Sequence, residues 1–147
     1  LRLPDTNDPL YNEAEISHMV DVKDLTDGIR TLWWITAVLI AVGLGFLLSQ
    51  PALRPVGLRA IYQGGLATVI ILAAIALFIG VGWSVFFVQF HELLFPPGTW
   101  TFRNSDSLIR LFPERFWFDI GVIMSVGALI LGLIVTGFGN WLIKKSS

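Results

Sequence analysis

Two histidines, His18 and His91, are the side chains of this 147-residue sequence best suited to proton transfer near neutral pH. Imidazole is the group whose ordinary pKa lies closest to physiological pH, so it can serve as a base or as an acid. His18 lies in NEAEISHMVDVKDL, between Glu15 and Asp21, each three residues away. On a helix these carboxylates share a face with the ring and can orient it. His91 lies in VQFHELLFPPG, directly after a long uncharged run.

Both histidines also allow a simpler interpretation. His91 can be an interfacial residue whose ring only points toward water, and His18 can be an exposed residue of an acidic helix. Ionisable groups this close to hydrocarbon are costly and often functional, which favours a role in chemistry for His91. The two histidines can work together if both lie on the same side of a membrane.

Other kinds of catalytic site have less support. His91 and Glu92 begin like the zinc-binding HExxH motif, but Phe95 stands where its second histidine is required. We therefore expect no metal site, although two histidines and a nearby carboxylate leave that possibility open. The sequence contains no cysteine and no GxSxG motif, and Ser105 in NSDS equally suits a helix cap. A metal-dependent hydrolase remains an alternative to acid-base catalysis by the two histidines.

The elements that must position these residues are membrane spans. The sequence is 54% hydrophobic, and residues 32–50, 60–90 and 120–143 carry no charged side chain. Each run is long enough for the roughly 18 to 20 apolar residues that cross a bilayer core as a helix. The net charge of −1 argues against nucleic acid as a partner, because phosphate binding needs a basic surface.

Basic residues indicate the orientation of the spans. Arg54 and Arg59 lie between the first two uncharged runs, and Lys144 and Lys145 follow the third. Lysine and arginine favour the cytoplasmic side, which places both histidine segments outside. The chain starts without Met or a signal peptide, so we expect a missing upstream segment. If that segment is one more span, the complete protein has four spans and both ends in the cytoplasm.

We therefore predict an all-α membrane protein, a three-transmembrane-helix bundle that carries an extracellular aromatic cap loop. Its predicted segments are an extracellular, partly helical leader at 1–30, a transmembrane helix at 31–50, a cytoplasmic loop at 51–64, a transmembrane helix at 65–90, an extracellular interfacial loop at 91–118, a transmembrane helix at 119–143 and a cytoplasmic tail at 144–147.

Three local patterns refine this prediction. Asn12 and Glu15 have the spacing of a capping box, which predicts a helix start in the leader. In the loop at 91–118, Asn104 or Ser105 is expected to cap a short helix that Pro113 ends. Several glycines of the spans are expected to allow close helix packing in lipid. They are Gly80, Gly82, Gly121, Gly127, Gly132, Gly137 and Gly139.

The segments EISHMVDVKDL and FHELLFPPGTWTFRNSDSLIRLFPERFWFD resemble those of the bacterial lipoprotein intramolecular transacylases, an integral membrane family. The resemblance extends over essentially the whole chain and implies four helices, of which this sequence has the last three. It implies that His18 and His91 are the two essential histidines. The implied reaction moves the sn-2 acyl chain of a diacylglyceryl lipoprotein to the α-amine of its N-terminal cysteine, giving the lyso form.

This resemblance implies an enzyme of the bacterial cell membrane whose active face is extracellular. It also implies that the substrate is a diacylated lipoprotein, that membrane lipid surrounds the enzyme and that no cofactor is needed. We predict that one histidine acts as base and the other as acid, with His91 favoured as the base. Supporting residues and donors to the oxyanion are Glu15, Asp21, Arg103 and Asn104. Aromatic residues expected to bind the acyl chains are Phe95, Trp100, Phe102, Phe112 and Trp117. The competing interpretation is a non-catalytic membrane subunit whose aromatic loop binds a partner.

Overall fold

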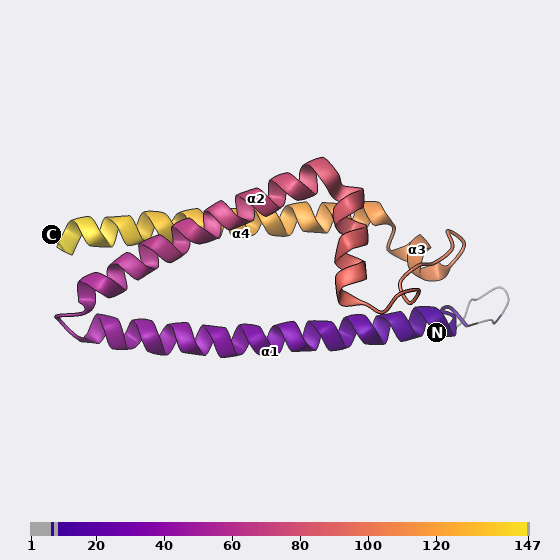
Figure 1. The fold of residues 1–147 in the computed structure, drawn as a ribbon, viewed down its shortest axis with the longest axis horizontal. Helices are drawn as coiled ribbons and strands as arrows, with labels where there is room; N and C mark the ends of the chain where they lie inside the picture. The colour runs from indigo at the N-terminus through magenta and orange to yellow at the C-terminus, as the bar shows by residue number, and fades with distance from the viewer. Residues whose placement is uncertain (1–6, 8, 147) are drawn as a thin grey trace. The chain divides into compact units, whose positions relative to one another are not determined.

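The computed structural model describes residue 7 and residues 9–146, and these residues form helices and no β-strand (Figure 1). The helices are α1 (Glu13–Ser49), α2 (Arg54–Leu94), α3 (Ser107–Leu111) and α4 (Glu114–Ser146). Helices α1, α2 and α4 are long and apolar enough to cross a membrane. The predicted all-α class, with three long helices that could span a membrane, is confirmed.

Prolines mark the connections between the helices. Helix α1 ends shortly before Pro51, and α2 begins one residue before Pro55. Pro96 follows the end of α2, and Pro113 separates α3 from α4. Proline lacks the backbone N–H and restricts the residue before it, so it ends helices but is tolerated in a first turn. The positions of the prolines, rather than the thickness of the bilayer, therefore set the ends of these helices.

The helices extend beyond the uncharged runs. The polar leader and the first run form one continuous helix from Glu13 to Ser49. Helix α2 already begins at Arg54, within the loop predicted at 51–64, and α4 begins at Glu114, within the loop predicted at 91–118. A helix continues past the hydrocarbon wherever its residues favour it, because its hydrogen bonds do not depend on the lipid.

The chain divides into two compact units along these helices. One unit contains α1 up to Thr31 and residues 82–120, and the other contains residues 32–81 and the chain from Gly121 onward. The division within α2 falls at Gly82, whose φ of −131° and ψ of 41° interrupt the helix. Both histidines lie in the first unit.

In the second unit, α2 and α4 approach each other through glycines. A Cβ atom added to Gly65 would lie 2.8 Å from the backbone nitrogen of Thr136, and one added to Gly139 would lie 2.8 Å from that of Tyr62. A Cβ on Gly132 would lie 2.9 Å from a methyl carbon of Val69. Close packing of this kind lets helices associate in lipid, where no hydrophobic force drives them together.

The prediction for the glycines is therefore correct at Gly132 and Gly139, and it did not include Gly65. A Cβ at Gly80, Gly82, Gly127 or Gly137 would meet no atom within 4 Å, so the prediction was wrong at those positions. Which glycines meet a neighbour depends on how the helices cross, and composition does not reveal this.

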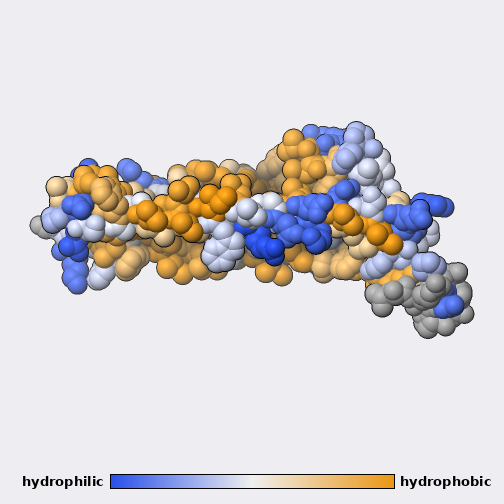
Figure 2. Space-filling model, turned by 90° about the horizontal axis from the view of Figure 1, so that it is seen from below, coloured by the Kyte–Doolittle hydropathy of each residue, from blue (hydrophilic) through white to orange (hydrophobic). Residues whose placement is uncertain are grey.

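Apolar side chains cover the second half of α1. Figure 2 shows this part of the helix in orange, beside the blue, hydrophilic residues of its first half. Leu32, Trp33, Leu39 and Phe46 are all more than half exposed. Apolar side chains on this scale require a non-aqueous neighbour, as expected for a helix in lipid.

Gly65→Ala is expected to destabilise the protein by about 1 to 3 kcal/mol, because the new methyl group would overlap the Thr136 backbone. Gly64→Ala is the matched control, since a Cβ there meets nothing within 4 Å and alanine is the better helix former. Thermal unfolding in detergent, followed by circular dichroism, measures the difference. Equal midpoints for the two variants would contradict the close contact.

Candidate active site

The start of α1 fixes the position of His18. The Asn12 backbone N–H donates to Glu15 Oε2 at 2.7 Å, and the Glu15 N–H donates to Asn12 Oδ1 at 2.9 Å. This reciprocal pair is the predicted capping box, which is thus confirmed. His18 follows Glu15 by three residues, so both side chains lie on one face of the helix. That face is buried, since Glu15 is 2% exposed and His18 is 7% exposed.

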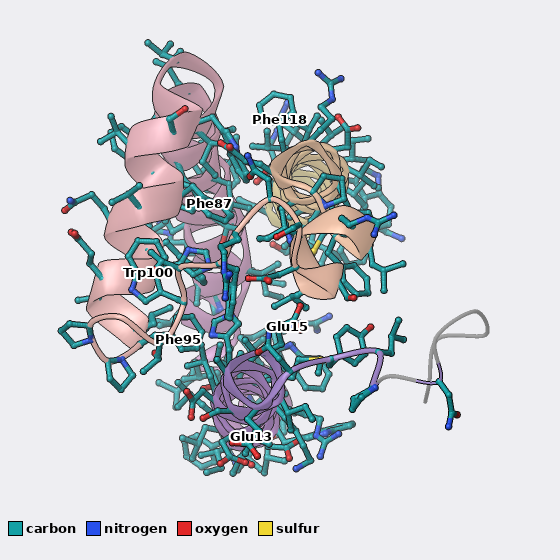
Figure 3. The ribbon with its side chains drawn as sticks, turned by 90° about the vertical axis from the view of Figure 1, so that its right-hand side faces the viewer. Glu13, Glu15, Phe87, Phe95, Trp100 and Phe118 are labelled. Atoms are coloured by element: carbon teal, nitrogen blue, oxygen red, sulfur yellow. The ribbon has the colours of Figure 1, made fainter. Side chains whose placement is uncertain are left out.

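The Glu15 carboxylate also connects α1 to α3. Its Oε1 accepts a hydrogen bond of 2.6 Å from the backbone N–H of Leu108, 93 residues away in sequence. Figure 3 shows Glu15 on the side of α1 that faces the loop and α3, whereas Glu13 points away from them. The carboxylate therefore accepts hydrogen bonds at the starts of both α1 and α3. These bonds go to the two helix starts and not to His18, which Glu15 was expected to orient.

Helix α3 starts differently from the prediction. Its N-cap is Asp106, not Asn104 or Ser105, and Asp106 makes no side-chain capping bond within α3. Instead, Asp106 Oδ2 accepts a hydrogen bond from the Arg103 backbone N–H at 2.7 Å and closes the turn before the helix. The capping oxygen comes from Glu15 of α1, which a search for local capping residues cannot find.

His91 lies in the last turn of α2, and its ring has a defined tautomer. Its Nδ1 lies 2.7 Å from the carbonyl oxygen of Phe87, four residues earlier. A carbonyl only accepts, so Nδ1 carries the proton when the ring is neutral, and Nε2 carries the lone pair. Nε2 is therefore the atom of His91 that can take a proton from a substrate.

The two imidazole rings lie next to each other, with centroids 6.1 Å apart and planes 27° from parallel. Phe95, only 6% exposed, contacts both rings, at 4.9 Å from His18 and 5.6 Å from His91. Phe102 lies 5.4 Å from His18, and Trp100 lies 5.1 Å from His91. Figure 3 shows Phe87, Phe95 and Trp100 gathered beside the end of α2. The pair of histidines thus has an aromatic surrounding.

Burial lowers the pKa of His18, and the neighbouring His91 lowers it further, while Asp21 opposes them by raising it. His18 precedes the uncharged run of α1, so it lies outside the membrane-spanning part of the helix. Its ring is therefore neutral at pH 7. Among the residues described, its Nδ1 is buried and has no hydrogen-bond partner. A buried ring nitrogen of this kind suits a bond to a substrate.

The other predicted site residues lie in three places: on α1, in the loop before α3, and in an aromatic cluster around Phe116. Asp21 is half-buried one turn after His18, whereas Arg103 and Asn104 are exposed in the loop before α3. Phe112 and Trp117 belong to a separate aromatic cluster around Phe116, with centroids 5.4 Å and 5.2 Å from its ring. Of the five aromatic residues predicted to bind acyl chains, only Phe95, Trp100 and Phe102 are recorded in ring contact with a histidine.

Two parts of the site were missed by sequence reasoning. The Phe87 carbonyl fixes the His91 tautomer, and its four-residue spacing from His91 on a helix is the signal that could have indicated it. A surface hollow of about 340 Å³ is lined by Glu92, Phe95, Pro97, Gly98 and Trp100, and no pattern in the sequence indicates it. Within the described part of the chain, no three residues among His, Cys, Asp and Glu form a group that could hold a metal.

The sequence profile of a family described as lipoprotein intramolecular transacylase Lit matches residues 2–117, a range that includes both histidines. The chain belongs to this family. The family predicted from the two histidine segments is thus confirmed. An uncharacterized protein of Aquifex aeolicus (strain VF5) is 27% identical to the chain over 129 residues, which are 85% of this chain and 54% of that protein. The chain spans about half the length of this curated relative. No solved structure matches the chain.

Glu15→Ala is expected to release α3 from α1, because it leaves the partly buried N–H of Leu108 without an acceptor, at a cost of about 1 kcal/mol. Hydrogen exchange at Leu108 measures this, and it should be faster than in the unchanged protein. Glu13→Ala is the matched control, since Glu13 is an exposed acid of the same helical turn that points away from α3 (Figure 3). Equal exchange in both variants would show that Glu15 does not hold α3.

The pKa of His18 is expected to depend on two neighbours, His91 and Asp21. The pKa of His18 should lie below its ordinary value of 6.5, and His91→Gln should raise it by removing the neighbouring positive charge. Asp21→Asn should lower it further, because that carboxylate favours the protonated ring. Nitrogen-15 NMR of labelled histidine across pH 4 to 9 measures these midpoints. A His18 midpoint above 6.5, unmoved by either substitution, would contradict the electrostatics described.

Proposed function

We propose that this protein is an intramolecular acyltransferase that moves the sn-2 acyl chain of a diacylglyceryl lipoprotein to the α-amine of its N-terminal cysteine. The observation that carries the proposal is the contact of His18 and His91, at 6.1 Å between centroids, in a chain that belongs to the transacylase family. The reaction requires a base for the amine and a proton for the departing glycerol oxygen. Two neighbouring imidazoles can supply both.

His91 acts as the base in this proposal. Its Nε2 removes a proton from the amine, whose nitrogen attacks the ester carbonyl carbon and forms a tetrahedral intermediate. The Phe87 carbonyl stabilises the resulting imidazolium, because Nδ1 already donates to it. The lone pair of Nε2 is thus directed to the substrate from the start of the reaction.

His18 acts as the acid. The neutral His18 ring first takes up the proton that His91 removed from the amine. When the tetrahedral intermediate collapses, the bond from carbon to the glycerol oxygen breaks, and that oxygen takes a proton from the His18 imidazolium. Both rings are neutral again at the end, so a neutral amine and an ester give an amide and a free sn-2 hydroxyl. Nothing is oxidised, and no water is consumed. Arg103 and Asn104, exposed in the adjoining loop, are the donors that we propose for the oxyanion.

The aromatic residues around the histidines favour this chemistry over hydrolysis. Phe95, Trp100 and Phe102 surround the rings with apolar surface that suits acyl chains and limits access of water. We further propose that this site faces outward from a bacterial cell membrane. The proposal is supported by Arg54 and Arg59, which lie in the first turns of α2, whereas His91 lies in its last turn.

His18→Gln and His91→Gln are each expected to lower formation of the lyso lipoprotein by about 10²- to 10⁴-fold, the usual contribution of a positioned acid or base. The measurement is tandem mass spectrometry of a diacylated lipopeptide incubated with the protein in membranes. Fragmentation is needed because the transfer changes the connectivity of the acyl chain without changing the mass.

Circular dichroism and gel filtration of both histidine variants serve as controls for folding. Unchanged turnover by both variants would contradict the proposal. If unchanged turnover is combined with loss of function in Trp100→Ala, the protein is better described as a binding subunit. Inactivation of the unchanged protein by a chelator would instead indicate a metal-dependent hydrolase.

A further inference from the structure

The hollow beside His91 combines a carboxylate with two aromatic rings. It has a volume of about 340 Å³ and is lined by Glu92, Phe95, Pro97, Gly98 and Trp100. Glu92 and Phe95 come from the end of α2 and the residue that follows it, while Trp100 comes from the loop that leads to α3. An open, partly apolar hollow that contains one anionic group can bind a small organic cation.

Glu92 is available to such a cation. Its Oε2 accepts a hydrogen bond of 3.0 Å from the Gln89 side-chain amide, which leaves Oε1 without a partner among the described residues. The three ion pairs recorded in the described part of the chain join Lys23 and Arg30 to Asp27, and Arg115 to Asp119. Glu92 is in none of them. Its negative charge is therefore not balanced by a side chain of the described residues.

The aromatic rings of the hollow are also those that touch His91. Phe95 lies 5.6 Å and Trp100 lies 5.1 Å from the His91 ring, measured between centroids. The faces of phenylalanine and tryptophan attract cations, and tryptophan attracts them most strongly. A cation held by Glu92 in this hollow would thus lie against the same two rings that contact the base proposed above.

We propose that this hollow binds the α-ammonium group of the N-terminal residue of the substrate, with Glu92 as its counter-ion and Trp100 as its aromatic wall. This inference rests on the proposed function. The bound ammonium first loses one proton to solvent, and His91 takes the next proton from the resulting neutral amine as it attacks the ester. The hollow would recognise a free N-terminus and hold its nitrogen next to the base. Glu92 and Trp100 are then residues that determine specificity for an unacylated N-terminus.

Binding of two lipopeptides to the protein in nanodiscs tests this site. One is diacylated with a free α-amine, and the other is identical but N-acetylated, so it carries no positive charge at that nitrogen. Using His91→Gln protein in both measurements prevents turnover of the first ligand. The free amine is expected to bind about 3- to 10-fold more tightly, as a partly exposed ion pair with an aromatic contact would provide.

Glu92→Gln in the same background should abolish this preference, while the N-acetylated ligand keeps its affinity. Trp100→Leu should reduce the preference, and Glu13→Gln is the control because Glu13 is exposed on the side of α1 away from the loop (Figure 3). Equal affinity for both ligands, or a preference that survives Glu92→Gln, would overturn the inference. A preference that is lost in Glu92→Gln supports the site, whether or not the unchanged protein forms lyso product. Absence of lyso product from the unchanged protein would contradict only the proposed reaction.

Discussion

The Glu15 carboxylate is the group on which the arrangement of the site depends. It is 2% exposed, and it accepts hydrogen bonds from the backbone N–H groups of Asn12 and Leu108. A buried carboxylate is costly unless its oxygens are hydrogen-bonded, and here each oxygen receives a backbone donor from the start of a different helix. One side chain thus fixes where α1 begins and where α3 lies beside it. His18, one turn later on the same face, is held against the loop that contains Phe102 and Trp100.

The rest of the chain follows from the need to satisfy backbone groups in lipid. Three long helices satisfy them internally, and their apolar side chains remain exposed to the surroundings. Within the second unit, Gly65, Gly132 and Gly139 allow α2 and α4 to pack closely. The first unit instead contains the buried polar residues Glu15 and His18. Close helix packing therefore holds the second unit together, whereas hydrogen bonds and aromatic contacts organise the first unit.

Local and periodic features could be predicted from the sequence. The uncharged runs identified the three long helices, and the spacing of Asn12 and Glu15 identified the capping box. Features that depend on residues distant in sequence could not be predicted. Nothing near Leu108 indicates that its N–H is bound by Glu15, and nothing in the sequence distinguishes Gly65, which meets Thr136, from Gly64, which meets nothing. The division of the aromatic residues into those around the histidines and those around Phe116 likewise depends on how the loop folds.

The reaction that we propose is intramolecular, which explains why so small a site can suffice. When the nucleophile and the ester belong to one molecule, most of the entropic cost of bringing them together is already met. The protein then has only to orient the amine, move protons and exclude water. A His91 ring with a fixed tautomer and a His18 ring kept neutral by burial suit the second of these tasks. Phe95, which contacts both rings, places apolar surface beside them without adding a polar group that could compete for the proton. A covalent acyl-enzyme would require a nucleophile, whereas the proposed transfer requires only two neighbouring imidazoles. The position of one of them, His18, depends on the helix start that Glu15 completes.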